Sequence, residues 1–260
     1  MTRGTRLLLL LLAIATGMQA QTPYRTRPAV DALLAGSGAA LYVLGRGATA
    51  QLTGLDSVEA AGLDYRTVNP VDRAATAVWN PALSRVSDVL RNGLVLAPLS
   101  LTASERIRED ALPVAVMYGE ALLLTRVTTK LTKAIVKRYR PFAFNPDVPA
   151  AVRIGNPDAR RSFYSGHAAM SWMAAVFTAR LFDASDIDPD AEKWVWGGAL
   201  STAGMVGMLR VVAGKHYPSD VVVGAAMGTA IALAVLALHE RDGRNGSGDR
   251  SVSLGLRFAL

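Results

Sequence analysis

The chain contains no cysteine, only three histidines and few charged side chains. Of its 260 residues, 19% are charged and 51% are hydrophobic. The absence of cysteine excludes a disulfide framework, a thiolate nucleophile and every zinc or iron–sulfur site built on cysteine. The apolar fraction is too high for a disordered chain, and the length suits one large domain. Any site that uses imidazole chemistry must therefore draw on three histidines.

The net charge of +7 comes from 28 basic and 21 acidic residues, and its distribution is uneven. Two of the excess charges lie in residues 1–20, and residues 133–161 hold seven basic side chains against two acidic ones, or +5. The rest of the chain is balanced, with 19 basic and 19 acidic residues. We expect the positive charge of residues 133–161 to attract an anionic substrate, and we expect no nucleic-acid partner.

The two ends of the chain differ in character from its body. Residues 1–20 place Arg3 and Arg6 before an apolar run from Leu7 to Ala15, which predicts an export signal or an N-terminal anchor. Residues 241–260 join a polar, glycine-containing linker to the alternating segment Ser251–Leu260, which predicts a flexible tail or an edge strand. We therefore expect a single helical domain over 21–240, with the motifs within 111–239.

The body of the chain predicts an all-α fold. Long stretches rich in Ala, Leu, Val, Gly and Met alternate with connections that contain Pro, Asp, Asn and Arg. About six such stretches make a helical bundle the expected architecture. The predicted helices are Val30–Leu44, Val86–Thr102, Ala111–Val136, Gly166–Phe182, Trp194–Val212 and Val221–His239.

Whether this bundle lies in a membrane is left open by the sequence. Val221–Leu238 is 18 residues long without a charge, which is long enough for a spanning helix. Other stretches are interrupted by charged side chains, and the connection 183–193 is unusually acidic for a cytoplasmic loop. The interrupting residues are Arg91, Glu120, Arg126 and Arg210.

The first motif is the basic segment that ends at Arg140-Pro141. Lys130, Lys133, Lys137 and Arg140 are spaced 3, 4 and 3 residues apart, which predicts one stripe on a helix. Pro141 disfavours helix at the preceding residue, so Arg140 is expected at the helix end. Lysine and arginine in this arrangement suit phosphate oxygens. A solvated basic face is the alternative interpretation.

The second motif is Ser165-Gly166-His167 at the start of an apolar stretch. Ser165 is a favourable N-cap, and the free backbone N–H groups after it can bind an anion. Gly166 permits a close backbone approach, and His167 lies in the first helical turn, where it can donate a proton. An ordinary capped helix start with a half-buried histidine is the alternative.

The third motif joins Arg210, His216 and Asp220. Gly214 permits a tight turn after the helix that carries Arg210, and Pro218 suits the first turn of the next helix. Asp220, one turn after His216, can fix the imidazole tautomer and leave the other ring nitrogen free as nucleophile or base. The alternative is a buried His–Asp pair that only links two helices. His239, the third histidine, is interpreted as a cap at a helix C-terminus.

Together these motifs resemble the three signatures of the type 2 phosphatidic acid phosphatase and vanadium haloperoxidase superfamily. The sequence departs from the usual pattern at Tyr164, where proline is common, and at Leu209, where serine is common. The resemblance implies an acid phosphatase/haloperoxidase-like helical fold and a phosphoric monoester or diphosphate hydrolase. The residues that carry it are Lys133, Arg140, Ser165, Gly166, His167, Arg210, His216 and Asp220.

The resemblance also implies a mechanism and the role of each residue. His216 would attack phosphorus to form a phosphohistidine, Asp220 would orient it, and His167 would protonate the leaving group. The remaining residues would bind the phosphate oxygens: Lys133, Arg140, Ser165, Gly166 and Arg210. This chemistry needs no cofactor and no metal ion.

Several functions remain open at this stage. The substrate is expected to be a lipid phosphate or isoprenyl diphosphate, and a soluble periplasmic acid phosphatase of small phosphomonoesters is the alternative. A vanadate-dependent haloperoxidase and a non-catalytic bundle that binds anionic lipid are less favoured. We expect an exported, membrane-associated envelope protein whose site faces the periplasm.

Counting membrane crossings creates a difficulty for that orientation. After a cleaved signal, spans starting near Val30, Val86 and Ala111 would place the site in the cytoplasm. Three alternatives remain: one early segment does not span, the N-terminal segment stays as an anchor while Val30–Leu44 lies flat, or the bundle is soluble.

Overall fold

A computed structural model describes residues 22–185 and 187–241 of the chain. The predicted export signal or anchor (1–20) and nearly all of the predicted tail (241–260) lie outside these residues. Within them the fold is all-α, as predicted, with only two isolated β-bridges, Tyr24–Glu240 and Leu55–Ile154.

The α-helices are α2 (Pro28–Ala50), α3 (Ser57–Ala61), α4 (Pro70–Arg73), α5 (Pro81–Leu101), α6 (Glu105–Arg108), α7 (Ala111–Val136), α8 (Pro141–Phe144), α9 (Ala150–Arg153), α10 (Gly166–Ala184), α11 (Glu192–Val212) and α12 (Pro218–His239). The 3₁₀ turns are η1 (Tyr65–Thr67), η2 (Ala74–Ala77) and η3 (Pro157–Arg160).

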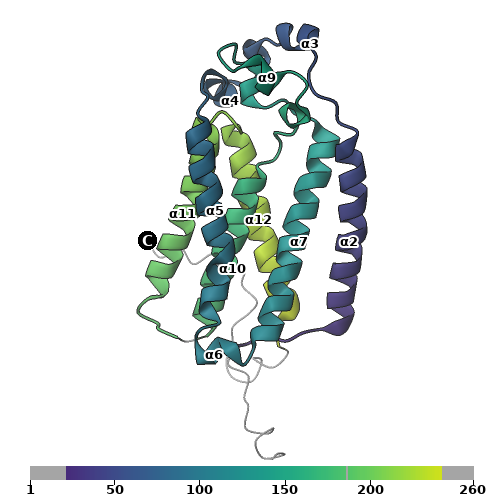
Figure 1. The fold of residues 1–260 in the computed structure, drawn as a ribbon. Helices are drawn as coiled ribbons and strands as arrows, with labels where there is room; N and C mark the ends of the chain where they lie inside the picture. The colour runs from purple at the N-terminus through teal and green to yellow at the C-terminus, as the bar shows by residue number, and fades with distance from the viewer. Residues whose placement is uncertain (1–21, 186, 242–260) are drawn as a thin grey trace, which may run out of the picture.

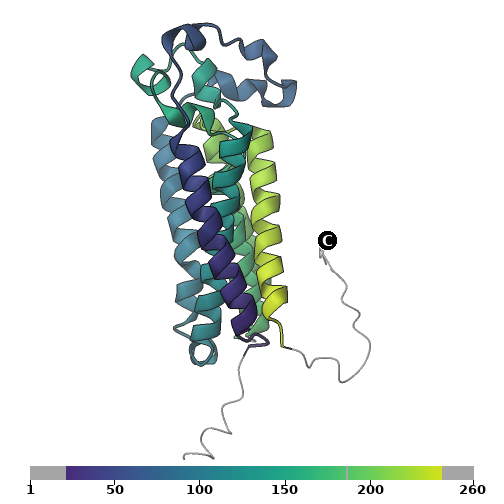
Figure 2. The same ribbon diagram turned by 90° about the vertical axis from the view of Figure 1, so that its right-hand side faces the viewer.

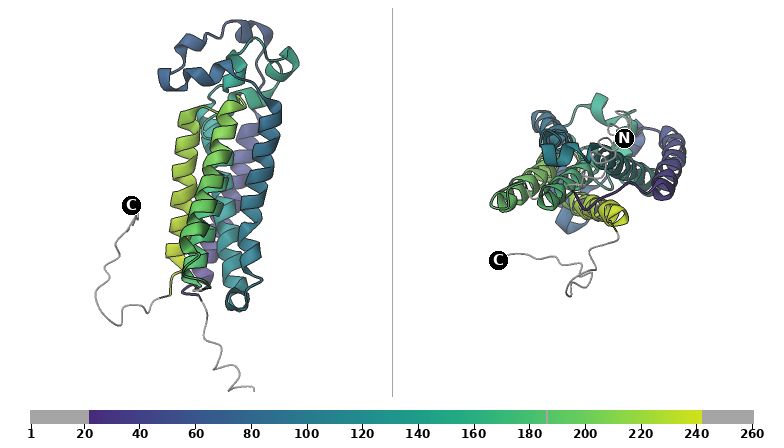
Figure 3. Two further views of the ribbon diagram at one scale, coloured as in Figure 1. Left: turned by 90° about the vertical axis from the view of Figure 1, so that its left-hand side faces the viewer. Right: turned by 90° about the horizontal axis from the view of Figure 1, so that it is seen from below.

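The long helices α2, α5, α7, α10, α11 and α12 stand side by side and form an elongated bundle (Figures 1 and 2). Helix α10 packs against α5, α7, α11 and α12, whereas α2 packs mainly on α7. Seen from below, α2 lies at the edge of the bundle (Figure 3). The short helices α3, α4 and α9 gather at one end, which we call the upper end as drawn in Figure 1.

Local sequence signals explain where the helices begin. Pro28, Pro81 and Pro218 occupy first-turn positions, where the missing N–H costs no hydrogen bond. Asn80 caps α5, because its side chain accepts hydrogen bonds from the backbone N–H of Ala82 and Leu83, each at 3.1 Å. Proline residues thus start α2, α5 and α12 before the predicted stretches, which began at Val30, Val86 and Val221.

Helix α7 has the predicted bounds Ala111–Val136, so it ends before Arg140, which the basic motif placed at the helix end. Val136 is its last residue, and Lys137 adopts the left-handed conformation (φ 49°) that closes the helix. Arg140 therefore lies three residues beyond this cap, where it precedes α8, and the predicted helical stripe from Lys130 to Arg140 is wrong at its C-terminal end. The turn at residues 137–140 frees Arg140 to point away from α7.

Helices α10 and α12 touch backbone to backbone at two glycines. A Cβ at Gly224 would lie 2.5 Å from the carbonyl oxygen of Ser165, and one at Gly228 would lie 2.0 Å from that of Ala169. No side chain fits in either place. These glycines bring the start of α10 against the first half of α12.

The segments before α2 and after α12 meet at the lower end of the bundle. The backbone N–H of Arg25 donates to the carbonyl of His239 at 2.9 Å, and that of Arg241 donates to Pro23 at 2.8 Å. Helix α2 runs upward from this end beside α7, so Val30–Leu44 does not lie flat across the bundle (Figure 1). The start of α2 and the predicted motifs are consequently at opposite ends.

Candidate active site

The three predicted motifs meet at the upper end of the bundle, between the long helices and the short elements above them. Lys133 is in the last turn of α7, Arg140 precedes α8, and Arg210 is in the last turn of α11. The second motif begins α10, and His216 and Asp220 flank the start of α12. Segments up to 87 residues apart in the sequence are thereby brought to one place.

His216 is held in one orientation between a carboxylate and a guanidinium. Its Nδ1 lies 3.4 Å from Oδ2 of Asp220, and its Nε2 lies 3.4 Å from Nη1 of Arg140. A guanidinium can only donate, so Nε2 carries the lone pair and Nδ1 carries the proton. Burial, together with the charges of Arg140, Lys133 and Arg210, holds the pKa of His216 well below its ordinary value. The side chain is therefore a neutral imidazole with a nucleophilic Nε2.

Asp220 is fully buried, and both of its carboxylate oxygens accept hydrogen bonds. Its Oδ2 accepts hydrogen bonds from the hydroxyl of Ser162 and the backbone N–H of Tyr217, and its Oδ1 accepts one from Arg138 at 2.7 Å. Arg138 also donates to Asp72 at 2.7 Å and lies over the Tyr217 ring. These contacts fix the Asp220 carboxylate beside the imidazole.

The predicted proton donor, His167, has two opposite partners on one nitrogen. Its Nε2 lies 2.5 Å from Oδ1 of Asp88 and 2.9 Å from Nη1 of Arg91, both on α5. When Nε2 of His167 carries a proton, it can donate a hydrogen bond to Asp88. When Nε2 carries a lone pair, it can accept a hydrogen bond from Arg91, which can only donate. Each protonation state of His167 thus has a partner already in place, as a general acid and base requires.

Arg140 and Arg210 are both buried and are positioned by different groups. Arg140 donates to the backbone carbonyl of Lys215 at 3.0 Å and to the side chain of Asp158 at 2.9 Å. Arg210 donates to the hydroxyls of Ser84 and Ser87 at 2.9 and 3.2 Å. Two guanidinium groups so placed suit the oxygens of a phosphoryl group.

Asp158 projects between the predicted phosphate-binding residues Lys133 and Arg140. Burial alone would raise its pKa, but the charges of Arg140, Lys133 and Lys215 outweigh burial and lower it. Its carboxylate is therefore ionised and occupies part of the Arg140 fork that a phosphate would use.

Ser165 and Gly166 build the turn that begins α10. The Ser165 hydroxyl accepts a hydrogen bond from the backbone N–H of Ala168 at 3.3 Å, the predicted N-cap. Its own N–H donates to the carbonyl of Asp220 at 3.0 Å, which ties the second motif to the third. At Gly166 a Cβ would lie 2.9 Å from the Thr129 methyl group, so this glycine lets α10 approach α7.

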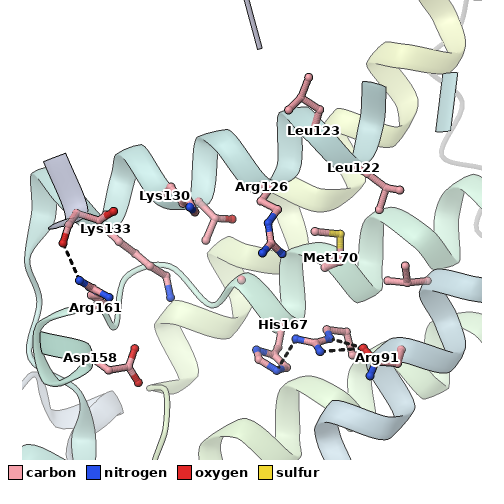
Figure 4. Close-up of a pocket in the computed structure, with 15 residues that line it drawn as sticks. Arg91, Leu122, Leu123, Arg126, Lys130, Lys133, Asp158, Arg161, His167 and Met170 are labelled. Carbon is pink, nitrogen blue, oxygen red and sulfur yellow. Dashed lines mark hydrogen bonds between the residues drawn. The ribbon is translucent and has the colours of Figure 1, made fainter. Parts of the chain in front are cut away.

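A cavity of about 640 Å³ opens beside these residues, between α5, α7 and α10 (Figure 4). Lys133, Gly166 and His167 line it, whereas His216 lies outside the lining and is 1% exposed. Further cations and apolar side chains complete the walls: Arg91, Arg126, Lys130, Arg161, Val95, Leu122, Leu123 and Met170. The cavity is therefore cationic near His167 and toward the C-terminal end of α7, and it is apolar at Leu122 and Leu123 in the middle of α7.

Sequence reasoning missed the partners that come from α5 and from the segment after α7. Arg91 was visible as a charge within an apolar stretch, and such a charge is costly unless it faces a polar interior. Asp88 belongs to none of the three motifs, and Arg138 lies within the first motif but was given no role there. The roles of both depend on packing between distant segments. The lining is cationic, so it suits an anionic ligand rather than a metal ion.

Comparison with known proteins identifies the family of the chain. The family model of the PAP2 superfamily matches residues 114–244. Decaprenylphosphoryl-5-phosphoribose phosphatase of Mycobacterium tuberculosis is 32% identical over 166 residues, which cover 64% of this chain and 81% of that protein. Phospholipid phosphatase-related protein type 1 of Homo sapiens is 28% identical over 177 residues, covering 65% of this chain and 52% of that protein.

A solved structure also resembles the fold. It is the transmembrane PAP2 type phosphatidylglycerolphosphate phosphatase from Bacillus subtilis, which is 21% identical in sequence. The superposition covers 77% of this chain and 94% of that one, with a TM-score of 0.47.

Proposed function

This phosphatase belongs to the PAP2 superfamily, and we propose that it removes a phosphate from a lipid phosphate or isoprenyl diphosphate. The observation that carries the proposal is the two-part cavity. Its cationic end suits a phosphate, and its apolar end, lined by Val95, Leu122 and Leu123, suits a hydrocarbon chain. The relative from Mycobacterium tuberculosis, named for a decaprenyl-linked phosphate, supports a polyprenyl substrate class.

The proposed reaction passes through a covalent phosphohistidine. The Nε2 lone pair of His216 forms a bond to phosphorus while the bond to the leaving oxygen breaks, and His167 protonates that oxygen. Water then attacks phosphorus, the P–N bond breaks, and His167 accepts the proton of the water. Arg140, Arg210 and Lys133 stabilise the negative charge of the transferring group.

A substrate comparison tests this function. Purified protein in detergent is supplied with a polyprenyl phosphate, a polyprenyl diphosphate and p-nitrophenyl phosphate, and released phosphate is measured. We expect kcat/KM to be at least about 100-fold higher for a lipid substrate, because apolar contacts contribute about 0.8 kcal/mol per buried methylene. Equal values for p-nitrophenyl phosphate would favour a phosphatase of small phosphomonoesters.

We propose that the bundle crosses the inner membrane with its upper end in the periplasm. By length and composition, four helical segments of the described chain can cross a membrane: Pro28–Ala50, Ala111–Phe144, Glu192–Val212 and Pro218–His239. Helix α12 has a mean hydropathy of 2.4, yet only 28% of it is buried inside the protein. An apolar outer face of this kind suits lipid.

This orientation places the start of α2 on the cytoplasmic side, where Arg25 and Arg27 fit the positive-inside rule. The acidic connection 183–193 between α10 and α11 lies at the same end and does not follow that rule. A cleaved export signal would instead leave that start outside and turn the site toward the cytoplasm. The orientation therefore requires that residues 1–20 do not carry the chain across the membrane.

Single cysteines test the orientation in this naturally cysteine-free chain. Val58 is 84% exposed on α3 at the upper end, and the Glu105 side chain is 93% exposed on α6 at the lower end. We expect a membrane-impermeant maleimide to label Val58→Cys in spheroplasts and Glu105→Cys only after lysis. The reverse pattern would contradict the orientation, and labelling of both before lysis would contradict a spanning bundle.

The pH dependence of activity is expected to have its alkaline limit near pH 8. Burial, with the charges of Arg140 and Arg210, lowers the pKa of Lys215 to about 8, although Asp158 and Asp88 oppose this. Lys215 loses its positive charge as the pH rises through this value, which weakens attraction of the phosphate. The lowered pKa of His216 keeps the nucleophile neutral as the pH falls through 6.5.

Steady-state kinetics between pH 5 and 10 measure this limit, with Lys215→Arg as the matched variant. Arginine stays charged, so the variant should keep its kcat/KM above pH 8 while the wild type declines. An unchanged decline in Lys215→Arg would assign the limit to another group.

Replacing Asp158 by asparagine is expected to tighten binding of inorganic phosphate about tenfold, since each 1.4 kcal/mol changes a binding constant tenfold. The amide keeps an oxygen acceptor for Arg140 but removes a negative charge from the phosphate-binding cations. Product inhibition by phosphate measures the effect. Asp147→Asn, an exposed change in the same connection, is the control. Equal inhibition constants in the wild type and Asp158→Asn would show that Asp158 does not compete with phosphate.

A further inference from the structure

Three side chains that the proposed reaction does not use converge at the lower end of the bundle. They are Asp31 near the start of α2, Glu120 in the first half of α7 and His239 at the end of α12. One potential ligand atom from each lies within 4.8 Å of the others. The sequence interpretation of His239 as a helix cap explains only part of this arrangement.

The hydrogen bonds of His239 define which nitrogen faces the carboxylates. Its Nδ1 lies 2.8 Å from the backbone carbonyl of Val235, one turn earlier in α12. A carbonyl oxygen can only accept, so Nδ1 carries a proton. Nε2 points the other way, toward Oδ1 of Asp31 at 2.8 Å and Oε2 of Glu120 at 3.3 Å.

Glu120 is the unexplained member of this group. Its side chain is 5% exposed, and neither of its carboxylate oxygens has a hydrogen-bond partner in the described part of the chain. A buried carboxylate without a donor is costly. Even if Nε2 were protonated, its single N–H would be directed to Asp31, which would leave Glu120 without a donor.

We propose that these three side chains bind a divalent transition-metal ion of the zinc class. One cation would coordinate Nε2 of His239 and both carboxylates at once. Its two positive charges would balance the two negative charges of the carboxylates. One imidazole and two carboxylates form a three-residue set of the kind that leaves a fourth position for water. The Val235 carbonyl would hold the imidazole in its ligating tautomer, as such partners of metal-bound histidines do.

The position of the group indicates what the ion would do. Helix α2 lies at the edge of the bundle and packs mainly on α7 (Figure 3). The ion would join α2 to both α7 and α12 through side chains at the end opposite the phosphatase site. Asp31, whose side chain is 19% exposed, leaves a route for the ion from solvent. The role is structural and independent of the proposed substrate.

Metal binding to the full-length protein tests the proposal without any activity assay. The protein is purified without a histidine tag, treated with a chelator and titrated with Zn²⁺ by calorimetry, and Co²⁺ binding is followed by visible absorption. We expect one high-affinity ion per chain and Co²⁺ bands of low coordination number. Glu120→Gln and His239→Gln should each weaken Zn²⁺ binding by about 100-fold or more, whereas Glu105→Gln on nearby exposed α6 should not.

Thermal unfolding of the wild type with and without Zn²⁺ provides a readout that does not depend on the variants folding. A ligand that binds only the native state raises the midpoint, so we expect Zn²⁺ to raise it. Wild-type protein that binds Zn²⁺ no more tightly than His239→Gln would overturn the proposal. So would an unchanged unfolding midpoint in Zn²⁺.

Discussion

Replacing His216 by alanine is expected to reduce kcat by about 10⁴-fold or more, the scale seen when a catalytic nucleophile is removed. No other described side chain presents a neutral, nucleophilic nitrogen between Arg140 and an oriented carboxylate. In the wild type, brief incubation with ³²P-labelled substrate should trap an acid-labile phosphoenzyme. The variant should give none.

The variant should remain folded, because Asp220 keeps its bonds from Ser162, Tyr217 and Arg138 when the imidazole is lost. Similar unfolding midpoints for the two proteins would verify this. Added imidazole should restore part of the activity by entering the space left by the side chain, which a purely structural role would not allow. Turnover within tenfold of the wild type would show that the nucleophile is elsewhere.

Replacing Gly228 by alanine is expected to destabilise the bundle by about 3 kcal/mol or more, at the upper end of the range for overpacked cores. The added Cβ would lie 2.0 Å from the Ala169 carbonyl oxygen and 2.9 Å from the Met173 nitrogen. Both atoms belong to the backbone of α10, so no side-chain rotation relieves the clash. Thermal unfolding in detergent should show a midpoint lower by about 10 °C.

Gly204→Ala on α11 is the matched control. A Cβ at Gly204 meets no atom within 4 Å, so alanine should stabilise the helix by about 0.5–1 kcal/mol through its lower conformational entropy cost. If Gly228→Ala unfolded at the wild-type midpoint, the close contact between α10 and α12 would be wrong.

The sequence predicted the helical fold because that fold depends on local patterns, and the family resemblance predicted that the three motifs act together. Ser165, Gly214 and Pro218 have the cap, turn and first-turn positions that their residue types favour. The placement of Arg140 at the end of α7 was wrong because Pro141 restricts only the residue immediately before it. It carries no information about the left-handed turn at Lys137, four residues earlier.

The partners of the catalytic residues were beyond the reach of motif reasoning. Arg138 reaches Asp220 across 82 positions, and Asp88 reaches His167 across 79. Such contacts depend on which helices are neighbours and on their rotation about their own axes. Arg91, Arg126 and Arg210 counted in the sequence against membrane-spanning helices. Arg210 is buried, Arg91 is half-buried in the lining of the cavity, and Arg126 lines the cavity as an exposed residue.

The backbone contact between α10 and α12 also determines which parts of the site can move. His167 begins α10 and His216 immediately precedes α12, so the glycine contacts make the acid and the nucleophile parts of one rigid body. Helix α5 has no such contact, because a Cβ at its Gly93 would meet open space. Asp88 and Arg91 both belong to α5, so an outward displacement of this helix would carry the two partners of His167 away together. His167 and His216 would keep their relative positions in such a displacement, whereas the proton-transfer partners of His167 would be lost.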